Sequence, residues 1–226
     1  MEISLHAEEQ RGDLGIPPRL LLGDSICRLP SRPEGIYSAD TCFIPGALLE
    51  DIFEFTVLRA SAFWEKEVVG ILGGTNSLWH MRASTMGDQT KAIIEQLQKQ
   101  EPQMKIMIMG IIPRLCDDQA IKNQIIKVRK EMKRACRETG AKFIPTHRAF
   151  INKQQEIKKE LYRPDGLHPS KEGQEEIVRS FSRGASMVTG TRVDKKLGRG
   201  VVKEYTKSGE ALRVMERVMG RRLFRN

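Results

Sequence analysis

Short apolar runs recur along residues 19–187, and each run is bounded by glycine, proline or polar residues. Uninterrupted apolar runs of this length are typical of parallel strands that are buried on both faces of a sheet. They predict strands at Arg19–Gly23, Glu67–Leu72, Lys105–Ile112 and Lys142–Pro145, with a weaker pattern at Ile36–Asp40.

Between these runs the apolar residues change to helical spacing, which indicates amphipathic helices. Pro45 precedes the first of these segments and Gly140 follows the third, as is typical of helix starts and ends. The predicted helices are Gly46–Ala60, Thr85–Gln100, Asp117–Thr139 and Ser170–Met187. Because strand and helix alternate about five times, the sequence predicts an α/β fold with α/β/α layers and about five parallel strands.

Candidate chemistry follows the first predicted strand. Active sites in parallel sheets lie at the carboxyl ends of the strands, and Gly23–Ser25 reads Gly-Asp-Ser directly after the run of leucines. A serine hydroxyl becomes an effective nucleophile when a neighbouring base takes its proton. The competing interpretation is a helix cap, in which Asp24 or Ser25 satisfies free N–H groups.

A base for this serine is offered by Asp165–His168, which reads Asp-Gly-Leu-His before the last predicted helix. A three-residue offset on one turn places both side chains together, so the carboxylate would hold one imidazole nitrogen and leave the other for the serine proton. The competing interpretation is a surface turn with a helix-capping histidine.

Two further positions suit the stabilisation of an oxyanion. Asn76 ends a Gly-Gly-Thr-Asn segment after the second strong strand pattern, and its side-chain amide would be worth roughly 3–4 kcal/mol in acyl transfer. Gly46 precedes a predicted helix and would donate its backbone N–H. The competing interpretations are a helix-capping asparagine and an ordinary loop glycine.

Taken in order, these motifs resemble the SGNH (GDSL-like) serine hydrolases, whose named residues are Ser, Gly, Asn and His. The resemblance covers about residues 19–187 and implies a flavodoxin-like fold and hydrolysis of carboxylic esters. It implies Ser25 as nucleophile, His168 as general base and Asp165 as the carboxylate that orients it. It also implies an oxyanion hole made of the Ser25 and Gly46 backbone N–H groups and the Asn76 side chain.

The chain departs from the family pattern at Ser77, where many members carry Asp, and at Ile26, where the family name implies Leu. Neither position has to take part in chemistry. Asp24 is interpreted as structural, bonding to nearby loop backbone. Similar esterase domains occur in the first open-reading-frame proteins of some LINE retrotransposons, and a small domain with a basic appendage resembles that setting.

Other polar residues near the motifs have ordinary interpretations. Trp79 and His80 follow Asn76, and helix packing is favoured over a place in a substrate pocket. Arg114 follows a strand, where a surface salt bridge is favoured over substrate contact. His6 and His147 carry no signal. No metal-binding pattern and no phosphate-binding glycine motif is present, so no cofactor or metal is expected.

Composition and charge indicate where the protein is located and distinguish a basic segment at its C-terminal end. Residues 1–18 form a polar extension without a signal-like pattern, and no apolar run approaches the roughly 20 residues of a membrane span. This predicts a cytoplasmic protein with four reduced cysteines. The formal net charge is +9, and residues 190–226 hold eleven basic and four acidic side chains, or +7 of that total.

The segment 188–226 is therefore predicted to be a basic linker followed by an amphipathic helix at Glu210–Asn226. A partner helix, nucleic acid and a membrane surface are competing contacts for this helix, and oligomerisation is open. Two functions follow. The first is a serine esterase that hydrolyses acyl or acetyl esters through an acyl-enzyme, with a small ester, favoured with a short acyl group, or an acylated lipid as substrate. The second is a binding module that associates with nucleic acid or protein through the tail.

Overall fold

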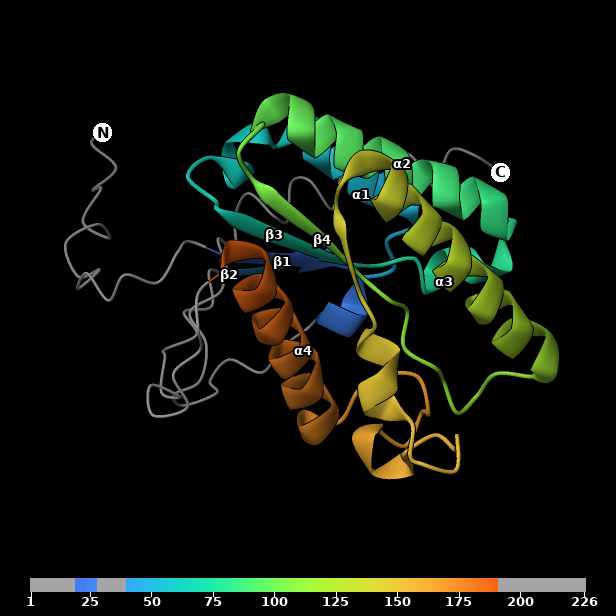
Figure 1. Cartoon of the computed structure of the whole chain (residues 1–226). Coiled ribbons are helices and arrows are strands. Elements are labelled where there is room, and N and C mark those ends of the chain that lie inside the picture. The colour runs from blue at the N-terminus through green and yellow to red at the C-terminus, as the bar shows by residue number, and fades with distance from the viewer. Residues whose placement is uncertain (1–18, 28–39, 191–226) are drawn as a thin grey trace, which may run out of the picture.

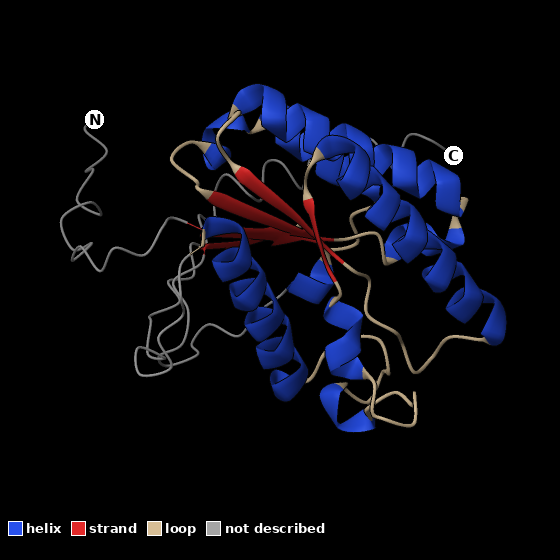
Figure 2. Ribbon diagram, in the orientation of Figure 1, coloured by secondary structure: helices blue, strands red, loops and turns tan. Residues whose placement is uncertain are grey.

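Five short segments pair side by side into one parallel sheet in the order β2-β1-β3-β4-β5 (Figure 1, Figure 2). This computed structural model describes residues 19–27 and 40–190. The strands are β1 Arg19–Gly23, β2 Asp40–Phe43, β3 Val68–Leu72, β4 Lys105–Met109 and β5 Lys142–Ile144. The order is that of flavodoxin-like sheets, so the predicted fold class is confirmed.

Helices cover both faces of the sheet. The α-helices are α1 Leu49–Leu58, α2 Ala83–Gln100, α3 Gln119–Thr139 and α4 Lys171–Thr189. Single-turn helices are η1 Ser25–Cys27, η2 Ala60–Phe63, η3 Asn76–Trp79, η4 Thr146–Phe150 and η5 Lys159–Leu161. Figure 1 shows α1, α2 and α3 on one face and α4 on the other, which gives the predicted α/β/α layers.

The strand side chains alternate between two apolar cores. Leu20 and Leu22 of β1 face the core under α1–α3, whereas Leu21 faces the core under α4. On β3, a Cβ at Gly70 would lie 2.7 Å from the ring of Phe181, so α4 packs directly against the strand backbone there. Because both faces are buried, the strands read as continuous apolar runs.

Element boundaries differ from the predicted ones where backbone geometry changes. The predicted strand Lys105–Ile112 ends at Met109, and Gly110 N–H makes the last bond toward β5, to the Ile144 carbonyl at 2.8 Å. The predicted helix at Gly46–Ala60 begins at Leu49, because Gly46 has a φ of 69°. The edge strand β2 begins at Asp40, where the weaker predicted strand ended.

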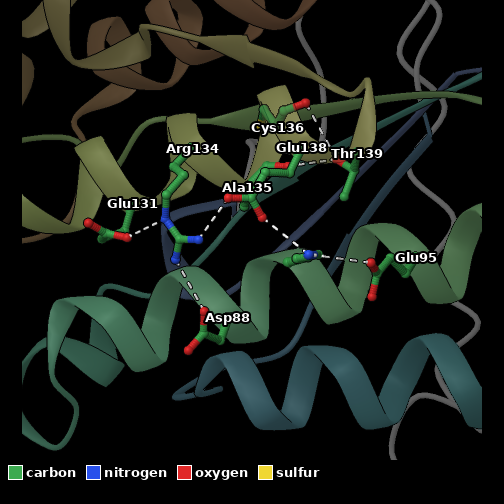
Figure 3. A network of polar contacts seen from close by, with 9 residues as sticks. Asp88, Glu95, Glu131, Arg134, Ala135, Cys136, Glu138 and Thr139 are labelled. Carbon is green, nitrogen blue, oxygen red and sulfur yellow. Dashed lines mark hydrogen bonds and ion pairs between the residues drawn. The ribbon is translucent and has the colours of Figure 1, made fainter.

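Charged side chains link α2 to α3 on the outer face (Figure 3). Arg134 contacts Glu131, Glu138 and Asp88, while Lys91 bridges Glu95 and Glu138. Such exposed pairs contribute little to stability individually. The apolar core beneath the two helices therefore supplies most of the stability of their packing.

The predicted N-terminal extension, most of the basic linker and the predicted helix Glu210–Asn226 lie outside the described residues. All four cysteines are described and have free thiols. Among the described helices, none has both the length and the apolar character that crossing a membrane requires.

Candidate active site

Ser25 lies on a turn that only glycine allows at the end of β1. A Cβ at Gly23 would lie 1.9 Å from the Leu72 carbonyl oxygen and 2.3 Å from the Cys27 Sγ. The chain therefore leaves β1 in close contact with β3 and turns at once into η1, where Ser25 is half-buried. The hydroxyl is placed at the carboxyl edge of the sheet, as expected for a site in this fold.

The Asp24 carboxylate ties this turn to the loop that carries Asn76. Asp24 is fully buried; its Oδ1 accepts the Ile26 N–H at 2.9 Å and its Oδ2 accepts the Thr75 N–H at 3.3 Å. Burial raises the pKa of Asp24 to about 6, and these N–H donors limit the rise. The interpretation of Asp24 as a structural residue bonding loop backbone is confirmed by these bonds.

The turn Asp165–His168 brings a carboxylate and an imidazole to the same edge. His168 Nδ1 lies 2.8 Å from Asp165 Oδ2, and His168 Nε2 lies 3.2 Å from Ser25 Oγ. The second carboxylate oxygen accepts the backbone N–H groups of Leu167 and His168, each at 2.8 Å. The three side chains thus form one continuous hydrogen-bonded row within reach of proton transfer.

The charge state of Asp165 determines which imidazole nitrogen of His168 donates a hydrogen bond and which accepts one. Desolvation raises the pKa of Asp165, but hydrogen bonds from the His168 backbone, the His168 imidazole and the Leu167 backbone outweigh it and bring the pKa to about 2. The carboxylate is therefore ionised at neutral pH and accepts from His168 Nδ1–H. In a neutral imidazole that leaves Nε2 as the acceptor for the serine hydroxyl.

The turn Asp165–His168 does not directly follow a strand. After β5 the chain first forms η4 and η5. Three contacts then hold the turn: Tyr162 bridges Pro169, Leu115 N–H donates to the Gly166 carbonyl at 2.8 Å, and the Tyr162 hydroxyl donates to Pro113. The loop after β4 thereby holds the turn that carries His168 in place.

The strand order places the two other predicted residues on either side of Ser25. Gly46 follows β2 and Asn76 follows β3, and β1 lies between these two strands. The Asn76 amide donates to the Ala47 carbonyl at 3.0 Å, next to Gly46. This bond uses one of the two N–H donors of the amide. Asn76 begins η3, and this side-chain bond crosses to the neighbouring loop.

Ser77, one of the departures from the family pattern, has a structural contact of its own. Its side chain is buried, and its hydroxyl oxygen accepts the Leu49 N–H at 2.9 Å. The first N–H groups of a helix have no partner inside that helix. Ser77 therefore satisfies the start of α1 and fixes it against η3, so this position contributes to how the Gly46 and Asn76 loops are held together.

Two sequence interpretations near the site are wrong, the second only in part. Trp79, expected to pack in a helix interface, is 60% exposed. Arg114, expected in a surface salt bridge, does pair with Asp117 but is 3% exposed, so only its expected surface position is wrong. Arg114 Nε donates to the buried Asp117 at 2.7 Å, and its guanidinium lies 5.3 Å from the centre of the Trp79 ring. The reason is tertiary: the loop after β4 folds against η3 and buries the arginine there.

His147, which carried no sequence signal, is a half-buried base in η4, just after β5. A Cβ at Gly110 would lie 3.2 Å from its Nδ1, and that nitrogen is buried without a hydrogen-bond partner among the described residues. Burial, together with the charges of Arg129 and Arg148, lowers the pKa of His147 to about 4. The imidazole is therefore neutral in the folded protein at physiological pH.

This shift predicts a pH dependence of stability. An unfolded histidine titrates near 6.5, so between about 6.5 and 4 the unfolded chain binds the proton that folded His147 does not. The free energy of unfolding is expected to fall as the pH drops through this window. Urea unfolding at pH 7 and pH 5 should show a smaller loss in His147→Gln than in the wild type. Equal losses in both proteins would contradict this assignment.

Comparisons with known proteins agree with the architecture. A model of the GDSL-like Lipase/Acylhydrolase family matches residues 21–176. A variant of an acetyl esterase, solved with acetate ion, is 17% identical, with 77% of this chain and 98% of that chain covered and a TM-score of 0.59. A variant of an acetyl-xylooligosaccharide esterase from Geobacillus is 18% identical, with 74% and 93% covered and a TM-score of 0.57.

The esterase domain of the ZfL2-1 ORF1 protein from a zebrafish retrotransposon is 22% identical, with 74% of this chain and 98% of that chain covered, and a TM-score of 0.41. That score is too low to support an argument, so the retrotransposon setting stays a prediction. At these identities the solved structures show the fold alone. No curated protein sequence matches this chain.

Proposed function

Because this chain belongs to the GDSL-like lipase/acylhydrolase family, we propose that it is a serine esterase that hydrolyses short acyl esters through an acyl-enzyme. The observation that carries the proposal is the hydrogen-bonded row from Ser25 Oγ to His168 Nε2 at 3.2 Å and from His168 Nδ1 to Asp165 at 2.8 Å. A nucleophile, a base and a group that orients the base are the parts that acyl transfer requires.

In the proposed mechanism Ser25 Oγ attacks the ester carbonyl carbon while His168 Nε2 takes the hydroxyl proton. The carbonyl oxygen becomes an oxyanion that accepts from the Ser25 and Gly46 backbone N–H groups and from the Asn76 amide. The C–O bond to the alcohol then breaks, and His168 returns the proton to the departing alkoxide. Water, deprotonated by His168, attacks the acyl-enzyme, and the acid leaves with Ser25 restored.

Short acyl groups are proposed because the similar solved structures include acetyl esterases and the chain has no long apolar lid segment. The binding-module alternative depends on the basic tail, which lies outside the described residues, as do any contacts with nucleic acid or a partner helix. The cytoplasmic location and the oligomeric state also stay predictions.

A fluorophosphonate probe tests the proposal directly, since it phosphonylates only an activated serine. We expect labelling of the wild type at Ser25, located by peptide mapping, and no labelling of Ser25→Ala. Hydrolysis of p-nitrophenyl esters from acetate to octanoate should be fastest for the shortest acyl groups. Equal labelling of the two proteins would refute the assignment of the nucleophile.

A further inference from the structure

Trp79 combines an exposed ring with a fixed position. Among the described residues, six large apolar side chains are exposed, at Val57, Leu58, Trp64, Trp79, Ile126 and Met187. Of these, Trp79 alone lies on a segment that carries a candidate site residue, since η3 begins at Asn76 and ends at Trp79. Its ring is 60% exposed and lies three residues after Asn76, a candidate oxyanion donor.

The contacts of Arg114 place this ring between two parts of the candidate site. Arg114 lies against the Trp79 ring, and the next residue, Leu115, donates its N–H to Gly166 in the turn that holds His168. Trp79 is therefore connected to Asn76 through η3 and to the His168 turn through the loop after β4. Both connections lead to segments that carry candidate site residues.

The same contacts hold the ring in place before any ligand arrives. The Arg114 guanidinium is almost fully buried and paired with Asp117, which is also buried. A buried ion pair is rigid, and a cation against an aromatic face adds attraction. With the guanidinium on one side, the exposed part of the indole faces solvent in a fixed orientation, so a ligand that stacks on it loses little side-chain entropy.

We propose that Trp79 is a stacking platform for the alcohol part of the ester and that this alcohol carries a six-membered ring, as sugars do. This inference rests on the proposed esterase function and names its substrate class. An open, flat surface suits the part of the substrate that remains near solvent, which for a short acyl ester is the alcohol. A single ring also matches a single indole, whereas a long alkyl chain requires a continuous apolar groove.

Matched substrates test this platform. Cyclohexyl acetate and isopropyl acetate share the acyl group and release secondary alkoxides of the same kind, so they differ only in the three additional carbons that close the ring. Trp79→Ala should lower kcat/KM about tenfold for cyclohexyl acetate, mainly through KM, and less than about threefold for isopropyl acetate. Trp79→Phe keeps a flat face and should retain most of the activity on the cyclic ester.

A binding measurement checks the same contact without turnover. The chain has two tryptophans, Trp64 and Trp79, and Trp64 lies on a different segment, directly after η2. In a Ser25→Ala, Trp64→Phe protein, the fluorescence therefore reports on Trp79 alone. Titration with cyclohexyl acetate should change this emission with saturation, and isopropyl acetate at the same concentrations should change it much less.

The outcomes separate the platform from the catalytic proposal. Equal losses of Trp79→Ala on both acetates, or Trp79 emission that cyclohexyl acetate leaves unchanged, would overturn the platform while ester hydrolysis and labelling of Ser25 stand. A wild-type protein that hydrolyses no ester and resists the fluorophosphonate would remove the esterase proposal, and the platform with it. Circular dichroism of each variant confirms that the fold is retained before kinetics are compared.

Discussion

Ser25→Ala and His168→Ala are each expected to lower kcat for ester hydrolysis by about 10⁴–10⁶-fold, and the double variant is expected to be no slower than either one. The hydroxyl and the imidazole lie 3.2 Å apart and would act as one unit in a proton transfer. Removing either partner ends that transfer, so removing the second costs nothing more. The residual rate would come from the oxyanion donors and from substrate binding.

Asp165→Asn should cost less, about 10²–10⁴-fold, since an amide in this position still bonds the backbone N–H groups of Leu167 and His168 but no longer holds an imidazolium. Initial rates on p-nitrophenyl acetate measure all four variants. Ser61→Ala, an exposed serine on η2, is the matched control and should retain wild-type kcat. Losses that multiply in the double variant would show that the two side chains act independently.

Asp24→Ala is expected to reduce the free energy of unfolding by about 2–4 kcal/mol, because the buried N–H groups of Ile26 and Thr75 lose their acceptor. Asp24→Asn keeps the volume and one carbonyl oxygen and should lose less. Urea unfolding followed by circular dichroism measures both. An Asp24→Ala protein as stable as the wild type would show that this carboxylate does not tie the two loops together.

The pH dependence of stability in the wild type and in Asp24→Asn gives an independent check on this carboxylate. The pKa of Asp24 is raised to about 6 in the folded protein, above the unfolded value of about 3.9. The folded state therefore binds more protons between these values, and this residue adds stability as the pH falls through the window. The stability difference between the wild type and Asp24→Asn should grow from pH 6.5 to pH 4. A difference that shrinks on acidification would mean the carboxyl is ionised throughout.

Sequence pattern was sufficient for elements that carry their own burial signal. The leucine run of β1 and the helical stripe of α3 were both predicted within a few residues, and Gly140 ends α3 in the left-handed conformation. The edge strand β2 was harder to predict: Asp40–Phe43 is short and mixes polar with apolar residues, and it pairs along one side only. Its position comes from pairing with β1.

For the candidate site, the motifs identified which residues to consider, while the contacts between them are tertiary. The distance from Ser25 to His168 depends on the long path through η4 and η5, and no local pattern encodes how that path folds back. Arg114 and Trp79 were misassigned for the same reason, since a buried arginine under an exposed ring is created by two loops meeting. His147 looked featureless because its depressed pKa arises mainly from burial, with added effects of Arg129, which is distant in sequence, and of the adjacent Arg148.

The position of β1 between β2 and β3 has an evolutionary consequence. The segments after β2 and β3 flank Ser25 from opposite sides, whereas His168 is carried by a third segment after η5. An insertion or deletion after β2 or after β3 would change the residues on that side of the candidate site. The distance between Ser25 and His168 would be kept, because other segments set it. Loops of this kind tolerate changes in length and sequence better than the strands they connect, so this edge of the sheet can vary while the fold is kept.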